Sequence, residues 1–430
     1  MINVLHITPH LGGGIGKALS GLISESVNTN KNIKHKILCL EYPVKDQFIN
    51  KISNLNIEIF VKPGDQEINK IVSDCEIIQI EWWNHPAMLE FLNTRLYLIK
   101  IRLVIWCHIS GLYNPIIPNK LIDYADYFIF TSPCSYKSIE NRYHNKKIPT
   151  NISVVSSGGG FDDIPVKTES FEDELKIGYL GSLNFAKLHP EYIDYLLSID
   201  DQELKINLIG DVVNKEILEY QCAINSRPNL LKFTGYTTDI SDELNKINVT
   251  PYLLNPYHYG TAENALLECM AMGIVPIVLN NPAEICIVDN MDTGIVIETK
   301  KEFADAINWL KENPLERKEI GRRAANKVRV KFNLSKMSNS FLEIYSNVIN
   351  QEKKAIPFKS IFGNNPSDWF LSCQANSKYF SKDGNVQVID NKFYNFILNE
   401  ETKGSVYHFS KYFRDSILLN KWAENLRSIK

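Results

Sequence analysis

Residues 2–19, INVLHITPHLGGGIGKAL, decide how the first half of the chain folds. Residues 2–8 have the pattern of a buried strand, and Ile15, Leu19 and Leu22 then recur at helical spacing. The glycines between them therefore predict a tight turn from a strand into a helix. The N–H groups at such a helix N-terminus suit a negatively charged or hydroxyl-rich ligand, and the alternative is a turn that binds nothing.

Two known phosphate-binding motifs do not fit these glycines. A Walker loop would place its first glycine at Leu11 and its hydroxyl residue at Ala18. A dinucleotide fingerprint that starts at Gly12 and Gly14 would place its third glycine at Lys17. The sequence therefore predicts a generic strand-to-helix turn.

Similar apolar strand patterns recur along the chain, separated by segments long enough for helices, which is typical of parallel sheets covered on both faces. A stretch rich in Gly, Asp, Pro and charged residues divides them into two groups and marks a linker. The first group lies at residues 36–40, 57–61, 76–82, 102–108, 127–132 and 152–158, and the second at 176–182, 205–211, 231–236, 249–254, 275–280 and 294–298.

These patterns predict an α/β chain with two tandem doubly wound, Rossmann-like domains, residues 1–160 and 176–335, joined by a linker over 161–175. A helical segment over 336–360 and a separate, aromatic-rich extension over 361–430 follow. Ligands of such sheets bind at the carboxyl ends of the strands, so we expect the active site in the cleft between the domains.

Composition and charge narrow the function classes. The net charge of −3 gives no reason to expect nucleic acid as a partner. The eight cysteines are scattered without a Cys-x-x-Cys pair, which favours reduced, buried, structural residues. A strand that begins at Ile2 leaves no room for a signal peptide, and no apolar run is long enough to span a bilayer. We therefore expect a cytoplasmic protein, with the inner face of the membrane as the alternative place of action.

Residues 255–284, NPYHYGTAENALLECMAMGIVPIVLNNPAE, carry most of the expected chemistry. The pattern predicts a helix that follows Gly260-Thr261 and ends at Gly273, and the N-terminus of that helix suits an anion. Glu268 would lie about two turns, or ~12 Å, beyond Gly260, where its carboxylate could accept from both hydroxyls of a ribose. Glu263 would face about 140° away from Glu268 on a regular helix, and it could reach the sugar if the helix starts later.

Six motifs, in their order and spacing, resemble those of family 4 glycosyltransferases of the GT-B fold. They are HITPHLGGGIGKAL (6–19), VIWCHISG (104–111), YLGSLNFAKLHP (179–190), INLIGD (206–211), FTGY (233–236) and GTAENALLECMAMG (260–273). The resemblance covers roughly residues 1–350. It implies a retaining transfer of a hexose from a nucleotide diphosphate sugar, with the nucleotide held by the C-terminal domain.

The resemblance also implies roles for single residues. Lys187 matches the lysine that contacts the diphosphate, His108 the histidine that lies against the donor sugar, and Glu268 the glutamate that binds the ribose. Gly13 and Gly14 match the glycine loop that faces donor and acceptor. Further donor contacts are expected from Ser182, Tyr236, Gly260, Thr261 and Ala262.

Two positions depart from the family pattern. Gly260 stands where the first glutamate of the family's Glu-x7-Glu motif is expected, and Ser182 replaces an arginine that often follows the glycine of LGS. Glu263 is the nearest carboxylate to the first departure. We therefore expect Glu263 to face the sugar hydroxyls and to be catalytic together with His108 and Lys187.

The acceptor is expected on the first domain, where the segment EWWNHP (81–86) ends a strand at the cleft. His10, Trp83, Asn84 and His85 would contact it by stacking and hydrogen bonds, although aromatic residues at such a place are equally often core residues.

The chain contains no Asp-x-Asp pair, so no metal and no other cofactor is expected. Lys187 and backbone N–H groups would then stabilise the charge on the leaving diphosphate. Glu81 and His10 are the only evident candidates for a general base on the first domain, which favours transfer with retention.

We therefore expect a glycosyltransferase that moves a hexose to a glycan or lipid-linked acceptor in bacterial surface polysaccharide synthesis. The alternatives are a catalytically inactive nucleotide-sugar-binding subunit, and an epimerase or phosphorylase of the same fold. Residues 403–426 mix aromatic and basic side chains, which suits contact with the acceptor or peripheral contact with a membrane. A small subdomain packed over the cleft is the other interpretation of that segment.

Overall fold

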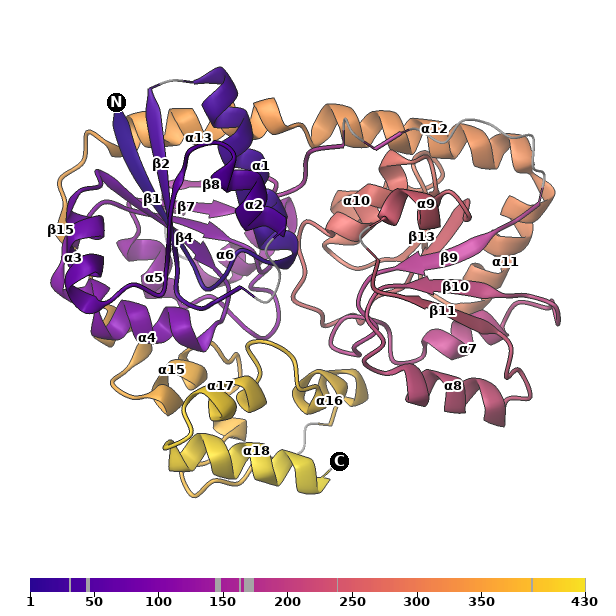
Figure 1. Ribbon diagram of the computed structural model, residues 1–430. Helices are drawn as coiled ribbons and strands as arrows, with labels where there is room; N and C mark the ends of the chain where they lie inside the picture. The colour runs from indigo at the N-terminus through magenta and orange to yellow at the C-terminus, as the bar shows by residue number, and fades with distance from the viewer. Residues whose placement is uncertain are drawn as a thin grey trace.

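The computed structural model describes residues 1–30, 32–43, 47–143, 148–161, 164–165, 174–237, 239–387 and 390–429. Two parallel sheets with helices around them form two domains that lie side by side (Figure 1). The predicted α/β fold with tandem Rossmann-like domains is therefore confirmed. Most of the predicted linker lies outside the described residues.

The first domain is built on a seven-stranded sheet of order β3-β2-β1-β4-β6-β7-β8, in which all pairs are parallel. The order reverses between β1 and β4, which is where ligands of such sheets bind. The strands are β1 (Ile2–Thr8), β2 (Ile33–Cys39), β3 (Glu58–Val61), β4 (Ile77–Trp82), β6 (Leu103–Cys107), β7 (Tyr127–Phe130) and β8 (Ile152–Val154). The helices are α1 (Gly13–Thr29), α2 (Gln47–Ser53), α3 (Asp65–Ser73), α4 (Pro86–Thr94), α5 (Asn119–Tyr124) and α6 (Tyr136–Arg142).

The second domain has a six-stranded parallel sheet of order β11-β10-β9-β12-β13-β14. Its strands are β9 (Ile177–Leu180), β10 (Ile206–Ile209), β11 (Leu231–Gly235), β12 (Val249–Tyr252), β13 (Val275–Leu279) and β14 (Ile295–Ile297). Its helices are α7 (Tyr192–Leu197), α8 (Lys215–Ile224), α9 (Ile240–Leu244), α10 (Asn264–Ala271), α11 (Lys300–Glu312) and α12 (Pro314–Lys331).

The chain returns to the first domain after α12. Helix α13 (Leu334–Val348) packs its apolar face against that domain's sheet, with Phe341 and Tyr345 in one core with Trp106. Strand β15 (Lys354–Ala355) then pairs antiparallel with β5 (Lys100–Ile101). The first domain is therefore closed by a helix and a strand from far along the chain.

We expected the extension to be a separate appendage. It instead shares one hydrophobic core with the first domain. The Trp82 ring of β4 stacks on the Phe362 ring at 5.5 Å between centroids. Tyr407, Phe409 and Trp422 are buried. In the segment expected to contact a membrane, these aromatic side chains therefore pack in the protein core. Its helices are α14 (Phe358–Phe362), α15 (Pro366–Ser372), α16 (Lys392–Asn399), α17 (Val406–Tyr412) and α18 (Ile417–Ile429).

Two expectations about the whole chain can be compared with the structure. All eight cysteines are free and seven of them are buried, which agrees with reduced, structural residues. Among the described residues, no helix is both long enough and apolar enough to cross a membrane.

Candidate active site

The carboxyl ends of the two sheets face each other, and three polar contacts join the domains there. Lys17 of α1 forms an ion pair with Glu268 of α10. The Thr131 hydroxyl lies 2.7 Å from that of Thr261. The Ser110 N–H donates to the carbonyl of Tyr259 at 2.9 Å. The motifs expected on opposite sides of a cleft thus come together in space.

The glycine loop brings the N-terminus of α1 close to that of α10. Gly12 caps α1, and Gly13 begins the helix with a φ of +60°, a conformation that glycine adopts without strain. A Cβ at Gly14 would lie 3.1 Å from the Asn264 side-chain nitrogen, at the start of α10. The small residues of this loop therefore keep two helix N-termini next to each other.

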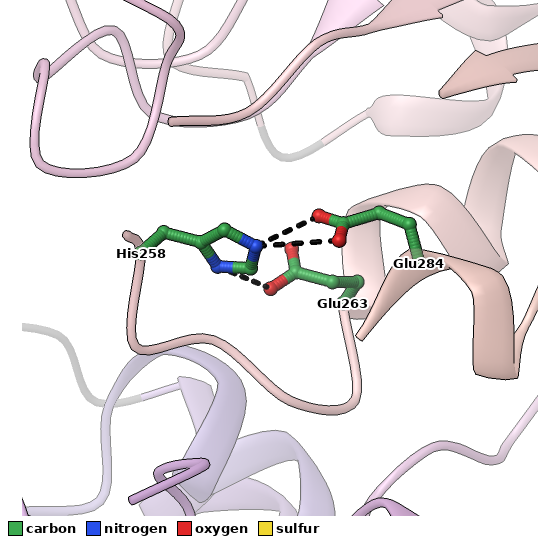
Figure 2. A group of neighbouring side chains, drawn as sticks. All are labelled: His258, Glu263 and Glu284. Atoms are coloured by element: carbon green, nitrogen blue, oxygen red, sulfur yellow. Dashed lines mark hydrogen bonds and ion pairs between the residues drawn. The ribbon is translucent and has the colours of Figure 1, made fainter. Parts of the chain in front are cut away.

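A buried charged cluster lies on the second domain directly behind this point. The Lys187 ammonium is 2.9 Å from Glu263 Oε2, which also accepts a hydrogen bond of 2.6 Å from the Tyr252 hydroxyl. The ring of His258 lies between two carboxylates, with Nε2 at 3.0 Å from Glu284 and Nδ1 at 3.9 Å from Glu263 (Figure 2). Two carboxylates are thus balanced by one ammonium and one imidazole.

The backbone at Glu263 creates this arrangement, and it corrects our helix boundary. Helix α10 begins at Asn264, later than a helix that follows Thr261 directly, because Glu263 has a left-handed backbone with a φ of 39° that a continuous helix excludes. The carboxylate folds back over Gly260. A Cβ at Gly260 would lie only 1.9 Å from Glu263 Oε1. Glu263 therefore fills the space that a side chain at position 260 would need.

Electrostatics keep the cluster charged although it is buried. Burial by itself favours the neutral form of Glu263, but Lys187, His258 and the Tyr252 hydroxyl together lower its pKa. Burial likewise opposes the protonation of His258, yet Glu284 and then Glu263 raise its pKa. The pKa of Lys187 is raised as well, because Glu263 outweighs the effect of burial. The cluster is therefore a fixed set of ion pairs.

Within the described part of the chain, His258, Glu263 and Glu284 form the one group whose ligand atoms, within 4.8 Å of one another, could hold a metal ion. Imidazole and carboxylate ligands suit a divalent transition metal. However, the Lys187 ammonium is already 2.9 Å from Glu263, and His258 already bonds Glu284. Both carboxylates thus already pair with side chains of the protein in this structure.

The other expected donor residues lie at different depths in the second domain. Glu268 follows Glu263 on the cleft side of α10, where its carboxylate holds Lys17. Ser182 follows β9 and accepts a hydrogen bond of 2.5 Å from the Asn184 side chain. Tyr236, after β11, is 57% exposed. Thr261 and Ala262 are buried in the loop before α10.

His108, at the end of β6, is held by a carboxylate from inside the first domain. Its Nε2 lies 2.8 Å from Glu81 Oε2, and Glu81 also accepts from the Gln79 side chain at 2.8 Å. Burial raises the pKa of Glu81, but the hydrogen bonds from His108 and His6 outweigh it and lower the pKa. Glu81 is fully buried, so the structure excludes it as a base in direct contact with an acceptor and makes it a partner of His108.

Two of the expected acceptor residues are covered by the extension. The Asn84 side chain is buried and donates to the Gly404 carbonyl at 3.1 Å. His85 is fully buried, caps α4 by accepting from an N–H, and lies 4.7 Å from the His408 ring. The expectation that Asn84 and His85 face an acceptor is therefore wrong for this conformation, because the pattern of residues 81–86 gives no sign that another segment packs on it.

The other two expected acceptor residues lie at the edge of the same contact. His10 Nε2 is 2.6 Å from the Lys403 ammonium. Trp83 is half-buried, and the same ammonium lies 5.9 Å from the centre of its ring. Both residues therefore meet the extension at the entrance to the cleft.

Three functional residues escaped sequence reasoning. His258 and Glu284 lie within the segment that carried most of the chemistry, but no spacing rule joins them to Glu263. Lys17 was considered only as part of a phosphate motif that failed, while its partner Glu268 stands 251 residues away. Only contacts across the fold identify these three.

Comparisons with known proteins agree with this architecture. Residues 160–327 match the family described as Glycosyl transferases group 1. No curated protein matches the chain. The solved structure of Anabaena Alr3699/HepE with UDP-glucose is 16% identical, with a TM-score of 0.64, over 81% of this chain and 100% of that one.

Two further solved structures are similar to the same extent. A glycosyltransferase from Rickettsia africae is 16% identical, with a TM-score of 0.63, over 81% of this chain and 99% of its own. Sucrose-phosphate synthase from Thermosynechococcus elongatus is 12% identical, with a TM-score of 0.58, over 81% and 99%. At these identities the structures show a shared fold. Residues 160–327 thus resemble the glycosyl transferases group 1 family, and the chain shares with these structures the GT-B architecture of two facing Rossmann-like domains.

Proposed function

We propose that the protein transfers a hexose from a nucleotide diphosphate sugar to a glycan or lipid-linked acceptor, with retention of configuration, in surface polysaccharide synthesis. The observation that carries the proposal is the Lys187–Glu263 ion pair of 2.9 Å behind the N-terminus of α10. The similar Anabaena structure contains UDP-glucose, which makes UDP-sugars the first donors to test.

The proposed roles follow from position and charge. The diphosphate would lie between the N-termini of α1 and α10, where free N–H groups and the Lys187 ammonium stabilise its negative charge. Glu268 would accept from the ribose hydroxyls and exchange its contact with Lys17 for them. Glu263 would orient the hexose, with its carboxylate held on the far side by Tyr252.

We infer retention because both candidate bases of the first domain, Glu81 and His10, already have partners. An inverting enzyme needs a general base within hydrogen-bond reach of the acceptor hydroxyl. Glu81 is buried behind His108, and His10 already contacts Lys403. A departing diphosphate can itself take the acceptor proton while Lys187 holds its charge. NMR of the product linkage tests this, because inversion of the donor's anomeric configuration would contradict it.

Replacing Lys187 is the direct test of the donor site. We expect Lys187→Ala to lower turnover by roughly 10²–10³, the scale for removing one preorganised donor from developing negative charge. Lys187→Arg keeps the charge and should retain more activity. Lys215→Ala, which removes a partly exposed lysine at the start of α8, serves as the matched control. Normal turnover of a folded Lys187→Ala protein would reject the role.

Metal independence is tested separately. With Lys187 and His258 as the cations of the cluster, EDTA should leave most of the turnover intact. Complete loss that a divalent metal restores would instead assign His258, Glu263 and Glu284 to a metal ion. An inactive sugar-nucleotide-binding subunit, one of the alternatives, would bind UDP without turnover on any acceptor.

A further inference from the structure

The extension forms most of the wall of a cavity at the entrance to the cleft. The cavity is open to solvent on one side. Five apolar side chains of the extension line it, and Tyr259 and Asn114 close it from the two domains. The apolar lining comes from Phe370, Phe380, Ile397, Leu398 and Val406.

This cavity adjoins the proposed donor site. Tyr259 immediately precedes Gly260, and its carbonyl accepts the Ser110 N–H at 2.9 Å. Tyr259 lines the cavity. Burial raises the pKa of its hydroxyl, and the charges of Lys187 and Glu263 act on that pKa in opposite directions. A molecule in the cavity would therefore approach the transferred sugar past Tyr259.

The outer wall is fixed to both domains. Glu400 accepts from the Phe185 N–H at 3.0 Å and from the Asn214 side chain at 2.8 Å, both on the second domain. Four residues later, the Gly404 carbonyl accepts from Asn84 on the first domain. The loop between α16 and α17 is thus a preformed part of the cleft.

One cation stands at the edge of this apolar space. The Lys403 ammonium contacts His10 and the face of Trp83, and in the described residues no carboxylate lies within ion-pair distance of it. Burial, and then Lys403 itself, lower the pKa of His10 to about 4, so this imidazole is neutral at pH 7. Burial lowers the pKa of Lys403, and the charge of Glu41 opposes that shift without forming an ion pair with the ammonium. Apolar walls with an ammonium that has no ion-pair partner among the described residues complement an amphiphilic anion.

We propose that this cavity binds the acceptor through an aliphatic chain that carries an anionic group, with the chain against Ile397 and Leu398 and the anion on Lys403. The proposal rests on the proposed function for the identity of the reaction. It adds that the extension selects the acceptor. In this arrangement the acceptor's hydroxyl-bearing sugar extends past Tyr259 toward the donor.

Binding measurements on the full chain test the proposal. Isothermal titration would compare decyl phosphate, decyl maltoside and inorganic phosphate, the two amphiphiles below their micelle concentrations. We expect decyl phosphate to bind at least tenfold more tightly than either of the others, because only it supplies both chain and anion. Equal binding of decyl phosphate and inorganic phosphate would overturn the proposal.

Variants locate the binding. Ile397→Glu should weaken decyl phosphate at least tenfold, whereas Ile417→Glu, at a site 72% exposed on α18, should leave it unchanged. Lys403→Gln should reduce decyl phosphate to the affinity of decyl maltoside and leave decyl maltoside unaffected. If Ile397→Glu and Lys403→Gln both bind like the wild type, the amphiphile binds elsewhere and the proposal fails.

UDP titrated into the same samples separates this proposal from the proposed function. UDP binding without decyl phosphate binding would reject the cavity alone. Decyl phosphate binding that needs Ile397 and Lys403, without UDP binding, would support the cavity and reject the donor site.

Discussion

At the scale of single residues, the site depends on one left-handed backbone. The backbone of Glu263 has a φ of 39°, which residues other than glycine, asparagine and aspartate rarely adopt. This conformation turns its carboxylate back over Gly260 and against Lys187. Glycine at 260 and glutamate at 263 are therefore one structural feature.

Exchanging the two residues tests this dependence. Glu263→Gly should lower kcat/KM by roughly 10²–10³ through loss of the carboxylate. Gly260→Glu alone should also be impaired, because its Cβ would lie 1.9 Å from Glu263 Oε1. The double variant Gly260→Glu, Glu263→Gly removes this clash, gives glycine the left-handed position and restores a carboxylate beside Lys187.

We expect the double variant to recover at least tenfold in kcat/KM over Glu263→Gly. Melting temperatures of all three proteins show whether they remain folded. Additive losses in the double variant would mean that the two positions act independently.

At the scale of secondary structure elements, the cleft is formed by the N-termini of α1 and α10. The two helices are joined by the Lys17–Glu268 ion pair and come closest where Gly14 faces Asn264. Each helix N-terminus presents N–H groups without partners within its own helix, and two that converge strengthen the attraction for an anion.

Adding a side chain at this approach should affect activity more than stability. In Gly14→Val, the Cβ would lie 3.1 Å from the Asn264 side-chain nitrogen, which can move at little cost to the fold. We expect the KM for the donor to rise at least tenfold while the melting temperature changes by only a few degrees. Gly64→Val, where a Cβ meets no atom within 4 Å, is the matched control. A donor KM like that of the control would remove the loop from the donor site.

At the scale of the whole molecule, the extension joins both domains and encloses neutral histidines. Burial, and then Lys403, lower the pKa of both His10 and His408 from 6.5 to about 4. His10 and Lys411 also lower the pKa of His408. Burial raises the pKa of Glu41, so protonation of this carboxyl in acid favours the folded state and opposes the histidines in part. The contact between extension and first domain thus requires uncharged imidazoles.

This requirement predicts a loss of stability in mild acid. Between pH 6.5 and 4 the unfolded chain binds more protons than the folded one at His10 and His408, so the free energy of unfolding falls as the pH drops and is fully retained above pH 6.5. We expect a lower melting temperature at pH 5 than at pH 7.5. His10→Gln with His408→Gln should reduce that difference, and an unchanged difference would assign the acid sensitivity to other groups.

The sequence by itself determined the parts of this protein that depend on local pattern. Apolar runs and the glycine turn of residues 2–19 predicted both sheets, because strand and helix periodicities are properties of neighbouring residues. The same patterns predicted that Lys187 and Glu263 lie in segments that face the cleft. The sequence could not predict where α10 begins, since that depends on one backbone angle at Glu263.

Only the tertiary structure decided which of those residues are open and which are covered. Asn84 and His85 lie just after β4, but Gly404 and helix α17, more than 300 residues later, pack on them. The aromatic side chains of the extension could have faced a membrane or a core, since both environments favour the same residue types. They are buried because the first domain offers a matching apolar surface, and such complementarity between distant segments exists only once the chain has folded.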